Sequence, residues 1–154
     1  MEIAKAIGVT ETYDGRSVVL ADLFNRGVLD VLVANQNGPL LLYKNTVASG
    51  RDWVQFELVG GARPGHEDGL SNRSAIGAQV HLFWKQGHDG ATQQQLQVVT
   101  AGDGYASQGM LRLHFGLGED ARIEKAIIKW PSGRSQTIEG PKVSVLHKIE
   151  EPSS

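Results

Sequence analysis

Apolar and polar residues alternate with a period close to two from Arg16 onward, which is the pattern of half-buried β-strands. In the first third of the chain this pattern predicts three strands, at residues 17–22, 30–35 and 40–45. The second and third strands are separated by a turn containing Asn37 and Gly38, which adopt positive backbone dihedrals at low cost. Three strands joined by short connections predict a β-meander.

A second series of strands follows residues 47–52, which are predicted to link two structural units. Seven half-buried strands are expected, at residues 53–60, 75–85, 95–102, 111–118, 123–133, 135–140 and 143–150. Apolar residues take every second position from 111 to 117, and Ile76 and the alternate residues after it are likewise predicted to face the core. The only helix predicted is one or two turns at residues 2–8. The fold class is therefore all-β, with an antiparallel β-sandwich at residues 50–154 preceded by the meander at residues 1–49.

Composition and charge narrow the functions that this fold can have. The 154 residues are enough for one ordinary domain, and 40% apolar with 21% charged residues is a globular composition. The formal net charge of -2, with both signs interspersed, gives no basic surface for nucleic acid. The chain has no long apolar run, so no membrane insertion is expected, and its start does not resemble a signal peptide. The absence of cysteine excludes disulfides and thiol catalysis.

Specific motifs resemble two known families. The sequences SNRSAIGAQV (71–80), GDGYASQ (102–108), LHFGLG (113–118) and IIKWPSG (127–133) resemble, in this order, the ASPIC/UnbV domain of bacterial proteins and cartilage acidic proteins. The segment ADLFNRGVLDVLVANQNGPLLLYKN (21–45) resembles an FG-GAP/VCBS repeat, the unit that builds one blade of a β-propeller. The resemblance implies a propeller-blade-like meander ahead of the sandwich and an extracellular or periplasmic location. Because only one repeat precedes the domain, we expect the end of a longer propeller protein or a free-standing relict.

The connection between the first two strands resembles the calcium-binding form of this repeat, D-x-D-x-D-G-x-x-D. In that form, oxygens arranged around a glycine supply the six to eight ligands that calcium takes. Here Asp22, Asn25 and Asp30 remain as a degenerate calcium-type loop, while Phe24 and Arg26 replace acidic residues. We therefore predict no bound metal. Either the Arg26 guanidinium replaces the ion by bridging both aspartates, or it points to solvent.

Polar residues in two of the motifs form the candidate ligand-binding site. They are Asn72, Arg73, Asp103, Tyr105, Ser107 and Gln108. A flat ring beside neutral donors and acceptors suits sugars or peptides. The alternative is a bracing role, in which the same side chains satisfy backbone carbonyls of the loops and between the sheets. The long polar loop at residues 61–74 is a further candidate functional segment.

The sequence predicts no catalytic residue. His81 and His114 lie on predicted outward strand faces with no carboxylate spaced to orient them, and no nucleophile or metalloenzyme motif is present. A solvent-facing or sheet-bracing role is therefore favoured for both histidines. The three tryptophans, Trp53, Trp84 and Trp130, are predicted to fill the core and the sheet edges.

These observations favour a non-enzymatic binding module for a glycan or protein ligand, without a cofactor. The alternatives are an enzyme of unknown class that uses Arg73, Asp103 and His114 in a cleft, and a purely structural oligomerisation domain. The meander strands are apolar on both faces, and a small isolated meander cannot bury both. We expect the sandwich to cover one face and a second copy the other. This predicts a homodimer whose interface includes residues from 17 to 45 and buries more than about 1,000 Å² in total.

Overall fold

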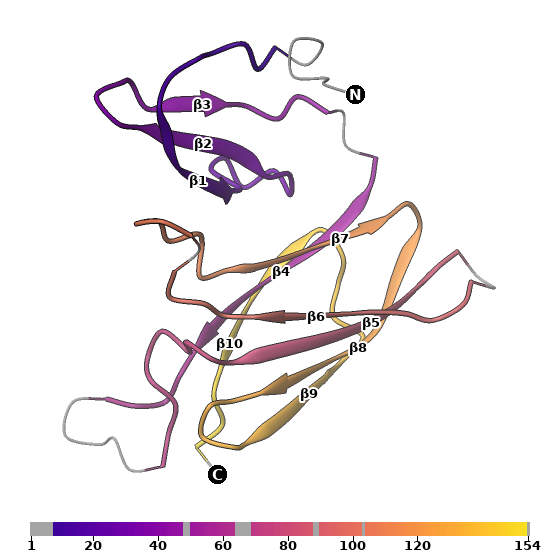
Figure 1. The fold of residues 1–154 in the computed structure, drawn as a ribbon. Coiled ribbons are helices and arrows are strands. Elements are labelled where there is room, and N and C mark those ends of the chain that lie inside the picture. Colours follow the sequence, from indigo (N-terminus) through magenta and orange to yellow (C-terminus); the bar gives the residue numbers. More distant parts are fainter. Residues whose placement is uncertain (1–7, 48–49, 64–68, 88–89, 103, 154) are drawn as a thin grey trace.

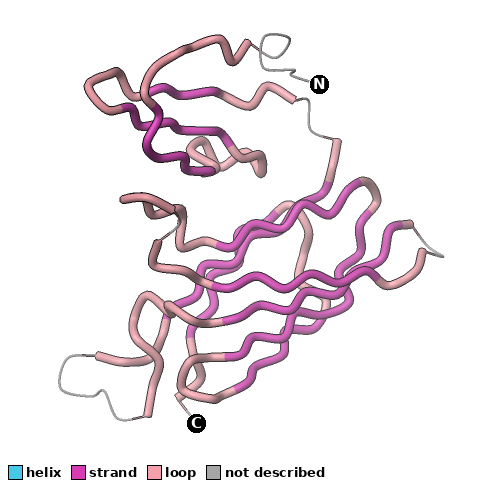
Figure 2. The backbone as a smooth tube through the Cα atoms, in the orientation of Figure 1, coloured by secondary structure: helices cyan, strands magenta, loops and turns pink. Residues whose placement is uncertain are grey.

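The computed structural model describes residues 8–47, 50–63, 69–87, 90–102 and 104–153 (Figures 1 and 2). These residues form strands and loops only, which confirms the predicted all-β class. The helical turns expected at residues 2–8 fall, apart from Gly8, outside the described residues. No helix in the described part of the chain is long and apolar enough to cross a membrane.

The first sheet is a three-stranded antiparallel meander in the order β1-β2-β3. Its strands are β1 (Gly15–Ala21), β2 (Asp30–Asn35) and β3 (Leu41–Tyr43). The turn between β2 and β3 places Asn37 at φ 54°, as its sequence predicts. The predicted meander is therefore confirmed.

Two further sheets pack face to face and form the predicted sandwich. One has the order β10-β4-β7 and the other the order β6-β5-β8-β9. Their strands are β4 (Asp52–Val59), β5 (Gln79–Gln86), β6 (Gln93–Val98), β7 (Leu113–Gly118), β8 (Ala121–Lys129), β9 (Ser135–Glu139) and β10 (Val145–Glu150). All seven strands lie within or close to the predicted segments.

The sandwich is not wholly antiparallel. Strand β10 runs parallel to β4, with Val145 opposite Val54 and Glu150 opposite Val59. The segment after β9 carries the chain from one sheet to the other, so β10 enters the second sheet from the same end as β4. The period of a strand is the same in both directions, and therefore the sequence pattern does not fix the direction of pairing.

The core lies between the two sheets of the sandwich. Phe56 of β4 and Phe115 of β7 meet edge to face, with ring centroids 5.9 Å apart. Trp84 and Trp130 are buried in this core, as predicted, while Trp53 is only half-buried. Ile76 is a correction, because its side chain is exposed. It belongs to the turn that precedes β5, whose backbone is held by Asn72, and the strand begins only at Gln79.

The meander contacts the sandwich through the loop between β1 and β2, residues 22–29, and not through a strand face. Within the three strands of the meander only Ala21 and Asp30 are buried, and both flank this loop. The expectation that the sandwich covers one face of the meander is therefore wrong. Instead, the loop packs on the outer face of β4 and β7. There Asp22 accepts a hydrogen bond from Gln55, and Gly27 lies against the ring of Trp53.

Candidate functional site

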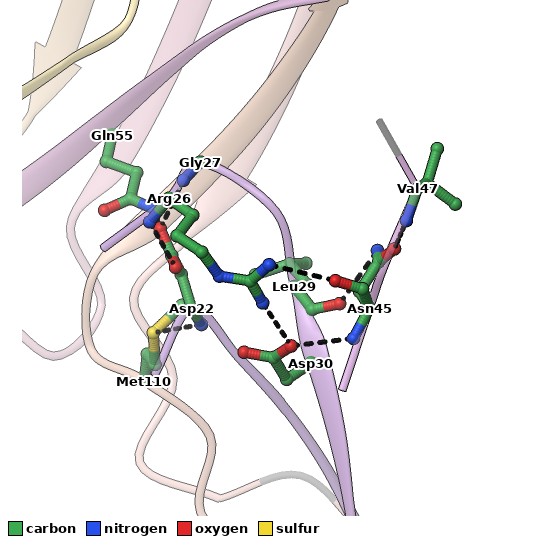
Figure 3. A network of polar contacts seen from close by, with 9 residues as sticks. All are labelled: Asp22, Arg26, Gly27, Leu29, Asp30, Asn45, Val47, Gln55 and Met110. Atoms are coloured by element: carbon green, nitrogen blue, oxygen red, sulfur yellow. Dashed lines mark hydrogen bonds and ion pairs between the residues drawn. The ribbon is translucent and has the colours of Figure 1, made fainter. Parts of the chain in front are cut away.

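The loop at residues 22–29 holds the carboxylate of Asp22 almost fully buried (Figure 3). Its Oδ1 accepts the backbone N–H of Arg26 at 2.8 Å, and its Oδ2 accepts the backbone N–H of Gly27 at 2.7 Å. The side-chain amide of Gln55 on β4 donates to the same Oδ2 at 3.0 Å. Burial acts to raise the pKa of Asp22, but these hydrogen bonds outweigh it, and the pKa lies below its usual value. Asp22 is thus held as an anion at the point where the loop meets the sandwich.

The guanidinium of Arg26 occupies the other half of the loop (Figure 3). It donates to Oδ1 of the buried Asp30 at 2.7 Å and to the backbone carbonyl of Asn45 at 3.0 Å. The backbone N–H of Asn45 also donates to this Oδ1, at 2.8 Å. The guanidinium therefore pairs with Asp30, as predicted, but does not contact Asp22, so it does not bridge the two aspartates. Arg26 reaches Asp30 with its side chain and Asp22 with its backbone, because the tight turn at Gly27 points the two backbone N–H groups at Asp22.

Two further residues of the loop, Asn25 and Phe24, contact cationic side chains. Asn25 accepts a hydrogen bond from Arg112 of β7's leading segment at 2.8 Å. The ring of Phe24 lies under two cations, 5.2 Å from the Arg26 guanidinium and 5.0 Å from the Lys44 ammonium. Among the described residues, no group of three or more histidine, aspartate or glutamate side chains is placed to hold a metal ion. The absence of a bound calcium ion remains a prediction.

The outer face of the sheet containing β4 and β7 receives the loop. A Cβ at Gly27 would lie 2.0 Å from Nε1 of Trp53, so only glycine fits against this ring. The Trp53 ring stacks on His114 at an interplanar angle of 17°, with centroids 6.3 Å apart. Arg112 and Met110 hold the other side of the loop, since Met110 Sδ accepts the backbone N–H of Asp22 at 3.2 Å. The loop at residues 22–29 therefore packs closely on the sandwich and connects it to the meander. We call this contact the joint.

His114 is oriented by the side-chain amide of Gln55, which the carboxylate of Asp22 holds in place. The amide nitrogen of Gln55 can only donate. It donates to the carboxylate of Asp22 and also to Nδ1 of His114, at 3.1 Å. The opposite amide orientation would direct the Gln55 oxygen at the Asp22 carboxylate, where no proton is available. His114 is therefore neutral and carries its proton on Nε2. Burial lowers its pKa, and the negative charge of Asp22 raises it by a smaller amount.

The structure places the candidate ligand residues in two loops at one end of the sandwich. Asn72 bonds both the N–H and the C=O of Ile76, so it braces its own loop. Arg73 lines a cavity of about 830 Å³ beside β4 and β10, which Tyr105, Ser107 and Gln108 do not line. Tyr105 and Gln108 are exposed, Ser107 is half-buried, and Asp103 lies outside the described residues. The structure thus does not gather the five described candidates into one cavity.

A buried carboxylate beside this cavity was missed by the sequence analysis. Oε2 of Glu151 accepts the N–H groups of Gly61 and Ser71 at 2.9 and 2.7 Å, and its Oε1 accepts the hydroxyls of Ser71 and Ser132 at 2.9 and 2.5 Å. Burial acts to raise the pKa of Glu151, yet the hydrogen bonds outweigh it and lower the pKa. The signal was present in two motifs, because Ser71 opens SNRSAIGAQV and Ser132 lies in WPSG. Glu151 therefore connects the end of the chain to both motifs through hydrogen bonds.

A comparison with protein families gives a match over most of the sandwich. The ASPIC and UnbV family matches residues 69–154, more than half of the chain. The chain belongs to this family. Membership of the ASPIC/UnbV family points to a non-catalytic module. A comparison with curated proteins finds no match.

The ASPIC/UnbV match begins after β4 and does not include the meander. Strand β4 nevertheless completes the sandwich, since it pairs with β7 on one side and β10 on the other. The resemblance of residues 21–45 to an FG-GAP/VCBS repeat, and the division at residues 1–49 and 50–154, stay predictions.

Calcium is expected to leave the melting temperature of this ASPIC/UnbV protein unchanged. Arg26 already supplies a positive charge to Asp30, and Phe24 offers no oxygen ligand to an ion. Thermal denaturation with and without millimolar calcium measures this. A saturable rise in melting temperature that EDTA reverses would show that the loop binds the ion.

Replacement of Arg26 by alanine is expected to lower the free energy of unfolding by about 2–4 kcal/mol, because it leaves the carboxylate of Asp30 buried and unpaired. The matched control is Arg16→Ala, which removes an exposed pair with Asp14 at the same 2.7 Å distance and should cost about 0–1 kcal/mol. Urea denaturation measures both. Equal, small losses would mean that Arg26 contributes no more than a solvent-facing arginine.

Mildly acidic pH is expected to lower the free energy of unfolding through protonation of His114, which lies at the joint between meander and sandwich. Since its pKa in the folded protein lies below the ordinary value of 6.5, the unfolded chain binds the proton first as the pH falls. Stability from neutral His114 is thus complete above about pH 6.5 and is lost as the pH falls below it. The groups that face His114 are Asp22, Gln55 and Trp53.

Urea midpoints between neutral pH and about pH 5 test this dependence. In His114→Gln, which keeps a neutral acceptor for Gln55, the slope of stability against pH should become shallower. His81→Gln is the control, because His81 packs on Phe83 of the other sheet. An equal change of slope in both variants would contradict the assignment to His114.

Proposed function

We propose that this ASPIC/UnbV protein is a non-catalytic module that binds protein through its meander. The observation that supports this is the exposure of apolar side chains on the meander. Leu40 is 67% exposed and Leu42 is 48% exposed on one face of the meander, while Val18 and Leu20 of β1, each more than half exposed, lie on the opposite face. Exposed apolar side chains on a soluble domain are typical of interaction sites.

One face of the meander carries apolar residues across all three strands. Leu42 of β3 lies opposite Leu32 of β2, and Leu32 lies opposite Val19 of β1, so the three share one face. Leu40, two residues before Leu42, extends this row. We call Val19, Leu32, Leu40 and Leu42 the leucine face. Burial of such a row against a partner is the ordinary way to stabilise a three-stranded sheet.

The partner that we propose for the leucine face is a second copy of the chain. Two identical apolar faces are self-complementary across a two-fold axis, which is the commonest symmetry of soluble oligomers. A stable interface of this kind should bury more than about 1,000 Å² within residues 17–45. The leucine face lacks this cover within the described structure, since Leu40 and Leu42 are exposed and the hydrogen bonds from the sandwich reach the meander at the loop of residues 22–29.

Sedimentation of Leu42→Glu tests the proposal. The variant should dissociate the dimer, because a carboxylate at the centre of an apolar interface is left without a partner. The control is Leu96→Glu, since Leu96 is 53% exposed on β6 of the sandwich and lies outside the leucine face. Loss of the dimer in both variants, or in neither, would contradict the assignment of the interface to the leucine face.

A glycan-binding role is the second candidate, and the exposure of Tyr105 favours it. This ring is 75% exposed in the loop between β6 and β7, and Gln108 beside it is exposed too. An exposed ring with neighbouring amides suits stacking and hydrogen bonding to a sugar. A glycan array read with the wild type and with Tyr105→Ala tests this. Binding that is lost in Tyr105→Ala, with an unchanged denaturation midpoint, would favour the glycan.

The proposal also concerns enzymatic activity, the family of the meander and the location of the protein. An enzyme that uses Arg73, Asp103 and His114 is disfavoured, because Arg73 lines the cavity beside β10 while His114 lines the two clefts under the meander. The meander is proposed to be an FG-GAP/VCBS-type unit, and an extracellular or periplasmic location follows from that resemblance. No cofactor is required for either binding role.

A further inference from the structure

A cleft of about 450 Å³ separates the edge of β1 from the sandwich. Figure 1 shows β1 as the meander strand nearest to the sandwich, with the segments that follow β6 and precede β7 on the opposite side. Val18, Val19 and Leu20 line the cleft from the meander, and Val98 and Met110 line it from the sandwich. The cleft continues the joint made by residues 22–29, because His114 lines it as well.

The wall formed by β1 is the edge of a sheet. Successive side chains of a strand point to opposite faces, so a cleft lined by three consecutive residues follows the strand edge. Within the described part of the chain, β1 pairs with β2 on one side only. From Ser17 to Ala21 this edge has no charge, no proline and no register shift, which are the usual protections against pairing.

The opposite wall of the cleft presents apolar side chains among polar ones, since Val98, Met110 and Leu113 line it beside Gln97, Thr100, Arg112 and His114. Gln97 is tied to β7 by a 2.6 Å hydrogen bond from its amide to the carbonyl of His114. Val98, the next residue, is 41% exposed. Met110 contributes a thioether, which adapts to irregular apolar shapes. An occupant therefore meets a row of backbone donors and acceptors on one side and apolar side chains on the other.

Among the described residues that line the cleft, Arg112 carries a positive charge and none is an aspartate or glutamate. The guanidinium of Arg112 is held at the rim by Asn25 and by the backbone carbonyl of Asp22. A ligand without positive charge, or with a carboxylate placed near Arg112, is favoured on this ground.

We propose that this cleft binds an extended segment of a partner polypeptide, which adds to β1 as a fourth strand of the meander. Only a polypeptide backbone can satisfy a row of strand-edge N–H and C=O groups along its length, and alternate apolar side chains would then fill the cleft. The volume accommodates a short strand and is within the range of ligand pockets. This inference concerns the β1 edge and does not depend on the leucine face or on a dimer.

Panning of a phage-displayed library of linear peptides on the full chain supplies the probe. A selected peptide, made synthetically, should bind the wild type, and Val98→Glu should weaken it by about tenfold or more because a carboxylate would enter the apolar wall. Leu96→Glu is the matched control, since Leu96 lies two residues earlier on the same face of β6 but does not line the cleft. It should change the affinity by less than about twofold.

Backbone methylation of the peptide tests strand addition itself. In a strand paired on one edge, alternate N–H groups point toward the partner strand. N-methylation of one alternate set should abolish binding, and methylation of the other set should leave it unchanged. Failure to select any peptide, equal loss with both methylated sets, or equal loss in Val98→Glu and Leu96→Glu would each overturn the proposal. A dimer that Val98→Glu dissociates would also overturn it, because the occupant would then be a second copy.

Discussion

Replacement of Gly27 by alanine is expected to lower the free energy of unfolding by about 2–4 kcal/mol. Gly27 has φ +76°, a conformation that costs an alanine about 1–2 kcal/mol. The added Cβ would also lie 2.0 Å from Nε1 of Trp53, so the loop or the indole must move. Both effects act on the joint between meander and sandwich, and the loss is expected to exceed that of an ordinary surface substitution.

Urea denaturation of Gly27→Ala and of the control Gly116→Ala measures this loss. Gly116 is on β7 with open space where its Cβ would lie, and its alanine variant should be as stable as the wild type or slightly more stable. The double variant Gly27→Ala with Trp53→Ala should lose less than the sum of the single variants, because the collision is gone. Strict additivity would mean that Gly27 and Trp53 do not contact each other as described.

Replacement of Glu151 by alanine is expected to cost about 4 kcal/mol or more. The change leaves the N–H groups of Gly61 and Ser71 and the hydroxyls of Ser71 and Ser132 without their acceptor in a buried place. It also releases the end of the chain from the loop ahead of β5. The control is Glu150→Ala, because Glu150 is the exposed neighbour and should change stability by about 0.5 kcal/mol or less.

Acid titration gives a second readout for Glu151. Its pKa in the folded protein lies below the ordinary value of 4.5, so its contribution is present above that pH and is lost as the pH falls toward the folded pKa. Denaturation midpoints measured between neutral pH and about pH 3 should fall less steeply in Glu151→Gln than in the wild type. An unchanged slope, together with a small loss in Glu151→Ala, would contradict the role assigned to this carboxylate.

The strands were predictable because short apolar or alternating segments are separated by turns. Residues 111–118 alternate strictly and residues 30–35 form a short apolar run, and each forms its strand within a residue or two. The direction of β10 was not predictable, since the period is the same in parallel and antiparallel pairs. The exposure of Ile76 was missed because a turn held by Asn72 interrupts the alternation before β5 begins.

The candidate site was only partly predictable, because its contacts join distant parts of the chain. The bond between Arg26 and Asp30 spans a few residues and was part of one of the two alternatives that the degenerate calcium-type loop left open. The bonds of Asp22 to Gln55 and of Ser71 to Glu151 join residues far apart in the sequence. No local pattern encodes which outward-facing glutamine or which terminal carboxylate will be buried by another element. The loop's role as a joint therefore came from the fold.

The joint at residues 22–29 is the central claim, since both the uncovered leucine face and the cleft beside β1 depend on it. Nitrogen-15 relaxation of the backbone amides measures whether the meander and the sandwich tumble together. We predict one rotational correlation time for β1–β3 and for β4–β10, because Asp22, Gly27 and Asn25 fasten the loop to Gln55, Trp53 and Arg112. A distinctly shorter correlation time for the amides of β1–β3 would contradict the account.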